Sequence, residues 1–83
     1  MGIDKTGLFK VIDMDVETVR QTLKEIYYIL EERGYNPTNQ LVGYLISGDP
    51  GYISSYKDAR KKIQELDRAK IVEILIKEFQ TNL

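Results

Sequence analysis

The chain has 83 residues, of which 42% are apolar and 30% charged, and its net charge at pH 7 is −1. This length predicts one domain, which buries only about 60% of the surface of its unfolded chain, so that a second subunit would add stability. The sequence contains no histidine and no cysteine, which removes the commonest general base and the usual ligands of transition metals, so we expect no metal, no cofactor and no enzyme activity.

The compartment is predicted from two further absences. No apolar run approaches the roughly 18 residues that span a bilayer. The first residues also lack the basic and then apolar pattern of a secretory signal, and a chain without cysteine suits a reducing compartment. We therefore expect a cytoplasmic protein that makes no contact with the membrane.

Residues 1–14 are predicted to form an N-terminal arm on a helical core of residues 15–83, within a single domain. The first seven residues, MGIDKTG, are polar and interrupted by glycine, which predicts a flexible segment. The next eight, LFKVIDMD, hold five apolar side chains, too many for a solvated tail. We expect this piece to lie extended against the core, or to form a short strand.

The first predicted helix runs from Val16 to Arg33. Asp15 is a good N-cap, and Glu17 lies in the first turn, where the helix dipole favours a negative charge. Gly34 supplies the left-handed residue that ends many helices. Apolar residues recur between these ends at intervals of three and four, the period of one helical face, at Val16, Val19, Leu23, Ile26 and Leu30.

A second helix is predicted within residues 34–53, GYNPTNQLVGYLISGDPGYI. Asn36 and Pro37 suit the N-cap and first position of a helix, because proline lacks only an N–H that would have no partner there. The pattern up to Ile46 is apolar nearly all round, which is typical of a short helix buried at the centre of a fold. Gly43 indicates the close approach of another backbone.

The end of this run repeats the same arrangement of turn-forming residues. Gly48 is expected to end the second helix, after which Asp49 caps and Pro50 begins a further turn. Together these residues predict a buried helical hairpin.

Residues 55–79 are expected to be helical, but their two apolar stripes do not share one phase. Either one long helix turns its apolar face, or a break near Asp67 makes two helices; Asp67 is a suitable N-cap, which favours the break. Tyr28 and Ile29 lie beside the main stripe of the first helix and favour a dimer surface. The predicted fold is an all-α, compact, homodimeric bundle of four to five helices with a buried helical hairpin and a flexible N-terminal arm.

Charge is unevenly distributed along the chain. Residues 13–33 hold six acidic and three basic side chains (−3), whereas residues 56–70 hold six basic and three acidic ones (+3), so the two segments should attract each other within or between subunits. The basic segment is either a solvated face or a protein contact. A helix-turn-helix that binds nucleic acid is a disfavoured alternative, because the chain is acidic overall.

The run in residues 34–53, followed by KDAR and IVEILI, resembles the small regulatory proteins of the IreB and ReoM type of Firmicutes, over roughly residues 22–79. The resemblance implies a helical homodimer without known enzyme activity. It also implies a substrate of the membrane-spanning PASTA-domain serine/threonine kinase and of its cognate phosphatase. Phosphorylation of a threonine in the arm would then influence peptidoglycan synthesis and antibiotic tolerance through protein partners.

Carried over to this chain, the resemblance places the phosphorylated residue at Thr6, because DKT is followed shortly by Phe9. Basic residues that transmit the signal in relatives match Arg60 and Arg68. The predicted receivers of the phosphate, which are also the expected partner-binding residues, are Lys57, Arg60, Lys61, Lys62 and Arg68. The alternative is that the phosphate repels an acidic surface of a partner. The chain departs from the usual pattern at four positions. Ser54 stands in place of a proline and Ser55 in place of an arginine, and Gln64 and Glu65 stand in place of a basic stretch.

Overall fold

The computed structural model describes residues 15–83. Within this range, all regular secondary structure is helical, which confirms the predicted all-α class. The elements are α2 (Val16–Glu32), α3 (Pro37–Ser47), the 3-10 turns η1 (Pro50–Tyr52) and η2 (Tyr56–Asp58), α4 (Ala59–Gln64) and α5 (Arg68–Thr81). None of the described helices is long and apolar enough to cross a membrane. The predictions for the arm, residues 1–14, lie outside the described residues.

The ends of α2 follow from their capping residues. The Asp15 carboxylate accepts a hydrogen bond from the Thr18 N–H at 3.2 Å, which satisfies one of the free donors of the first turn. Gly34 adopts φ 89°, and the Tyr35 N–H donates to the Leu30 carbonyl at 3.0 Å, as in a Schellman motif. The helix ends at Glu32, one residue before the predicted end.

The helix caps and turns predicted in residues 34–53 are confirmed. Asn36 caps α3 by accepting a hydrogen bond from the Asn39 N–H at 3.1 Å. Gly48 ends α3 with φ 77°, a left-handed conformation that costs glycine little. The Asp49 carboxylate then accepts from the Gly51 N–H at 2.8 Å and so caps η1.

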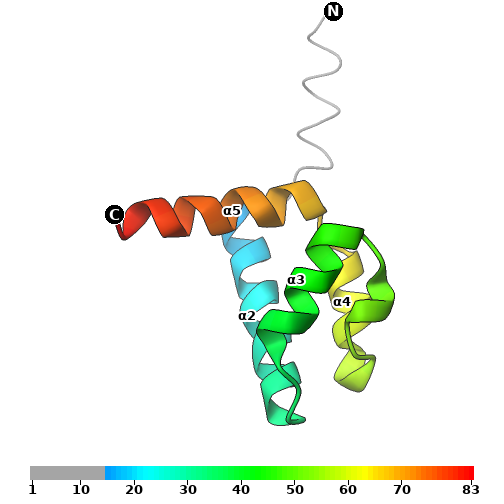
Figure 1. Ribbon diagram of the computed structural model, residues 1–83. Coiled ribbons are helices and arrows are strands. Elements are labelled where there is room, and N and C mark those ends of the chain that lie inside the picture. The colour runs from blue at the N-terminus through cyan, green and yellow to red at the C-terminus, as the bar shows by residue number, and fades with distance from the viewer. Residues whose placement is uncertain (1–14) are drawn as a thin grey trace, which may run out of the picture.

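The predicted break near Asp67 is present, so residues 55–79 do not form one helix. α4 ends at Gln64, and the Asp67 carboxylate caps α5 by accepting from the Ala69 N–H at 3.2 Å. Figure 1 shows α5 lying across the ends of the other helices, with its C-terminal half extending beyond them.

The core lies where α2 packs against α4, closed by the first half of α5 and by the loop after η1. Its fully buried side chains are Val19, Ile26, Leu30, Ile53, Ile63 and Ile71. Burial of an aliphatic side chain of this size contributes roughly 1.5–3 kcal/mol, so this cluster is the main stabilising feature of the domain. The apolar stripe predicted for α2 accounts for three of these six positions.

The prediction of an all-round buried second helix is wrong for α3 in the single chain. Only Pro37 and Tyr44 of α3 are buried, whereas Val42 is 48% and Ile46 80% exposed. The physical reason is that α3 packs on the bundle through one side only, while its other side faces solvent. Its apolar residues therefore form a surface rather than a centre.

The close approach predicted at Gly43 is real, but its partner is a side chain and not a backbone. The ring of Tyr52 in η1 covers Gly43, and a Cβ atom at this position would lie 2.9 Å from the ring atom Cγ. Gly43 thus allows η1 to fold back onto α3.

Candidate functional site

The five predicted receivers of the phosphate lie on η2, on α4 and at the first residue of α5. They are Lys57, Arg60, Lys61, Lys62 and Arg68. α4 packs against α2, so this basic segment faces the acidic helix of its own chain. Thr6 lies outside the described residues, and its role stays a prediction.

A cluster around Glu32 joins the end of α2 to η2. The Lys57 ammonium donates to both carboxylate oxygens of Glu32, at 2.9 and 3.1 Å, and the Tyr56 hydroxyl donates to Oε2 at 3.1 Å. These hydrogen bonds, from Lys57 first and then Tyr56, lower the pKa of Glu32 below its usual value. The same carboxylate raises the pKa of Lys57. Lys57 is therefore an internal partner of Glu32 rather than a free cation.

The backbone of η2 is strained at two consecutive positions. Lys57 has φ 47° and Asp58 has φ 63°, and the left-handed conformation costs a residue with a Cβ atom roughly 1–2 kcal/mol. Contacts around this turn offset the strain: the Glu32 cluster holds Lys57, and Ala59 directly after it is fully buried. The turn directs α4 against α2.

A second ion pair joins α4 to α2. The Lys62 ammonium lies 3.5 Å from a carboxylate oxygen of Glu25. Together with Lys57 and Glu32, this pair confirms that the acidic and basic segments attract each other, and it places that attraction within one chain.

The two arginines of the basic segment bind backbone carbonyls. The Arg60 Nε donates to the Ile53 carbonyl at 2.8 Å. The Arg68 Nη1 donates to the Leu45 carbonyl at 3.2 Å, and its guanidinium lies against Gly48, at the C-terminal end of α3. A cation is favourable there because the last carbonyls of a helix carry partial negative charge.

Lys61 differs from the other four predicted receivers. Its side chain is exposed, and among residues 15–83 it has neither an ion-pair nor a hydrogen-bond partner. An incoming phosphate or carboxylate would meet Lys61 directly, whereas it would have to displace existing partners from the rest. The geometry therefore singles out Lys61 within the basic segment.

The disfavoured helix-turn-helix alternative does not fit the connection between α3 and α4. That motif joins its two helices by a turn of about three or four residues. Here α3 ends at Ser47 and α4 begins at Ala59, so residues 48–58, with both 3-10 turns, lie between them. The α3–α4 pair lacks the motif's short turn.

An apolar groove lies between α2, α3 and α5. It is formed by Leu23, Tyr27 and Tyr28 of α2, Leu41 and Leu45 of α3, and Leu75 of α5, and has a volume of about 260 Å³. Tyr28 is 58% and Leu75 47% exposed. Exposed apolar surface that is hollowed in this way is typical of an interaction site.

A second apolar surface, the α3–α5 face, consists of Val42 and Ile46 of α3 and Val72 and Ile76 of α5. Ile46 is 80% and Ile76 58% exposed, and Ile46 and Val72 line one shallow hollow. The members on each helix are four residues apart and so share one side of that helix.

Comparison with known families decides what kind of protein this is. The model of the IreB regulatory phosphoprotein family matches residues 4–81, nearly the whole chain. The chain belongs to the IreB family. The resemblance noted in residues 34–53 is thus confirmed, and the description of the family is that of a regulatory phosphoprotein. The matched range includes Thr6.

In this IreB-family protein, sequence reasoning missed Glu32 as the residue that organises η2. A signal was present, because Glu31 and Glu32 place two negative charges at the C-terminal end of α2, where the helix dipole disfavours them. Such a placement indicates a cationic partner elsewhere in the chain. The missed residues of the apolar surfaces, such as Leu75, carry no comparable signal, since apolar residues of a helix are normally read as core.

The described part of the IreB-family protein presents exposed apolar surfaces and exposed ion pairs. Among residues 15–83 there is no group of three or more acidic side chains that could hold a metal ion. No buried side-chain polar atom of this range lacks a hydrogen-bond partner. Its shifted pKa values belong to exposed ion pairs, those of Glu32, Lys57 and Glu73.

Proposed function

We propose that this IreB-family protein is a non-enzymatic, cytoplasmic regulatory phosphoprotein of the cell-envelope stress pathway. A membrane serine/threonine kinase phosphorylates Thr6, and a cognate phosphatase removes the phosphate. Through protein partners, the two forms differ in their effect on peptidoglycan synthesis or antibiotic tolerance. The observation that supports this proposal is the family match over residues 4–81, which includes Thr6.

Phosphorylation would act through charge. A phosphate adds roughly −1.5 to −2 charges and three strong hydrogen-bond acceptors. In the proposed mechanism it is received by the basic segment, first by Lys61, whose ammonium has no partner among residues 15–83. The neighbouring Lys62 pairs with Glu25, which lies ten residues along α2 from Asp15, or about 15 Å at 1.5 Å per residue. The nine residues from Thr6 to Asp15 span about 30 Å when extended, which is enough to reach this site.

The homodimer is part of the same proposal, with the α3–α5 face as its surface. The support is that Ile46 and Ile76 leave most of their apolar area in water in the single chain. Sedimentation of the Ile46→Asp protein tests this assignment, with Thr38→Asp, at an exposed position in the first turn of α3, as the control. A dimer that dissociates only in the Ile46→Asp protein supports the assignment, and an unchanged dimer contradicts it.

The proposed function is tested by the site of phosphorylation. The full chain is incubated with ATP and the kinase domain of its host, and the product is analysed by intact mass and peptide mapping, with Thr6→Ala as control. A single phosphate that maps to Thr6 and is absent from the Thr6→Ala protein supports the proposal. No phosphate, or phosphate spread over Thr18, Thr22 and Ser54, contradicts it.

A further inference from the structure

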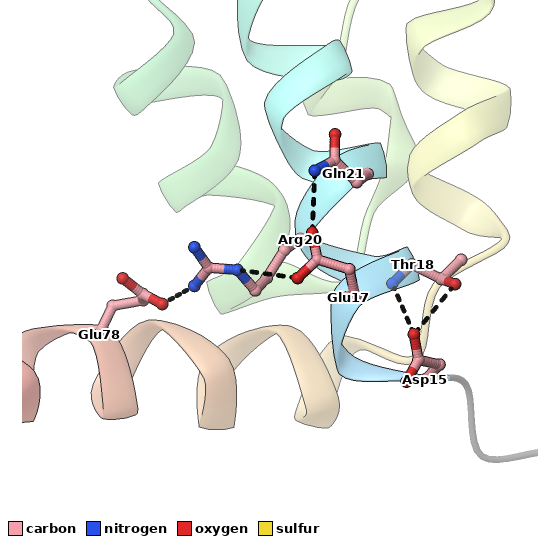
Figure 2. A network of polar contacts seen from close by, with 6 residues as sticks. All are labelled: Asp15, Glu17, Thr18, Arg20, Gln21 and Glu78. Atoms are coloured by element: carbon pink, nitrogen blue, oxygen red, sulfur yellow. Dashed lines mark hydrogen bonds and ion pairs between the residues drawn. The ribbon is translucent and has the colours of Figure 1, made fainter.

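The apolar groove continues toward the start of α2. A second hollow adjoins it and shares Leu23, Lys24 and Leu75 with it, so that the two run along α2 from Arg20 to Tyr28. At this entrance Arg20 forms ion pairs with Glu17 and with Glu78 of α5, and Asp15 lies in the turn just before them (Figure 2). The groove therefore opens close to the point where the described chain begins.

The chemistry of the groove suits apolar side chains of a peptide. Small-molecule sites usually have about 300–1,000 Å³ and several converging polar groups. Here the volume is about 260 Å³, and Lys24 is the charged residue of an otherwise aliphatic and aromatic lining. Among residues 15–83, Lys24 has no ion-pair partner, so an occupant of the groove that carries a carboxylate would form an ion pair with Lys24.

We propose that the groove holds the chain's own segment Leu8–Met14. Five of its seven residues are apolar, and Asp13 supplies a carboxylate for Lys24. The segment ends one residue before Asp15, from which Leu23 and Tyr28 lie about 12 and 20 Å along α2. Seven extended residues span about 23 Å, so the segment covers this distance when it runs back along α2.

The covalent link favours this occupant over a second copy of the chain. A segment joined directly to the start of the groove has an effective concentration on the order of millimolar. A second copy would first have to give up its free translation and rotation. At lower protein concentrations the chain's own segment therefore fills the groove.

The docking is tested on the full, unphosphorylated chain by paramagnetic relaxation in NMR. The chain contains no cysteine, so Lys10→Cys takes a single nitroxide in the middle of the segment. We expect strong broadening of the amide signals of residues 23–28 and of Leu75, and loss of this broadening when the nitroxide is reduced. In an equal mixture of isotope-labelled chains and spin-labelled, unlabelled chains the groove signals should remain sharp.

Two matched pairs of variants locate the contact. Phe9→Asp with Ile12→Asp should abolish the broadening, whereas Ile3→Asp, outside the segment, should leave it. Tyr28→Asp should weaken it several-fold, whereas Tyr35→Asp, at an exposed tyrosine outside the groove, should not.

Three results would overturn the inference. The first is the absence of broadening in the groove, and the second is broadening in the mixed sample, which assigns the groove to the segment of another copy. The third is a concentration-dependent shift of groove signals that persists when residues 1–14 are removed, which assigns it to a dimer contact. None of these results depends on the kinase. If the segment docks but the kinase assay places no phosphate on Thr6, the proposed function alone is contradicted.

Discussion

The ring of Tyr52 lies directly against Gly43, and this contact joins η1 to α3. A Cβ at Gly43 would stand 2.9 Å from Cγ of the ring, so Gly43→Ala must displace Tyr52. Overpacking of this kind costs about 1–3 kcal/mol, and the better helix propensity of alanine offsets about 1 kcal/mol. We expect a net loss of about 1 kcal/mol in the free energy of unfolding, measured by urea denaturation.

The same substitution in a Tyr52→Ala background provides the control. The three atoms nearest to a Cβ at position 43 all belong to this ring, so in its absence the helix propensity of alanine should make the double variant more stable than Tyr52→Ala alone. A loss of equal size in both backgrounds would show that something other than the ring limits position 43.

Glu32→Gln should change how stability depends on pH. The pKa of Glu32 is lowered in the folded chain from 4.5 by the Lys57 and Tyr56 hydrogen bonds. Its stabilising contribution is therefore complete above about pH 4.5 and is lost as the pH falls through the lower, folded pKa. The Glu32→Gln protein should be less stable than the wild type at pH 7, and the difference should shrink in acid.

Denaturation curves at a series of pH values between 2 and 7 measure this effect. Glu31→Gln is the matched control, because Glu31 is its neighbour in sequence and shares neither of these hydrogen bonds. Parallel pH profiles for the wild type and Glu32→Gln would contradict the role assigned to the cluster.

The caps and helix limits were predictable because they depend on local chemistry. Asp15, Asn36 and Asp67 each accept a backbone N–H within three residues, and the left-handed Gly48 donates its N–H to the Tyr44 carbonyl four residues earlier. These caps and this left-handed residue can be inferred from neighbouring residues in the sequence.

The burial of α3 and α5 was not predictable from their patterns. An apolar side chain such as Ile46 or Phe79 reads as core in a helical period, but its burial depends on whether another element covers it. α3 packs through one side and α5 extends beyond the bundle, so Ile46 and Phe79 are 80% and 67% exposed. The apolar groove and the α3–α5 face follow from this arrangement.

The left-handed turn at Lys57 and Asp58 provides a further test. Asp58 has φ 63° and makes no capping hydrogen bond, so the side chain stabilises little while the backbone is strained. Glycine adopts this conformation readily, whereas alanine does so at a cost of roughly 1–2 kcal/mol. We expect the free energy of unfolding of Asp58→Gly, measured by urea denaturation, to exceed that of Asp58→Ala by about 1 kcal/mol. Equal stabilities would mean that the turn rearranges.

Lys61→Ala and Arg68→Ala should separate signalling from stability. Arg68 donates to the Leu45 carbonyl at the end of α3, so its removal should lower the free energy of unfolding by about 0.5–1.5 kcal/mol. Lys61 is exposed and has no partner among residues 15–83, so Lys61→Ala should stay within about 0.5 kcal/mol of the wild type.

The part of this comparison that concerns signalling uses the phosphorylated chain. With Thr6 phosphorylated, the Lys61→Ala protein should lose the extra stability that a docked phosphate confers, measured by urea denaturation of the phosphorylated and unphosphorylated chains. Lys77→Ala, which removes an exposed lysine of α5 that lies outside the basic segment and outside the groove, should retain this extra stability. Because Lys61 has no hydrogen bond or ion pair within residues 15–83 to lose, an effect there reports on the phosphate, whereas an effect at Arg68 must first be corrected for the weakened end of α3. Identical behaviour of the phosphorylated wild type and Lys61→Ala would remove Lys61 as the receiver.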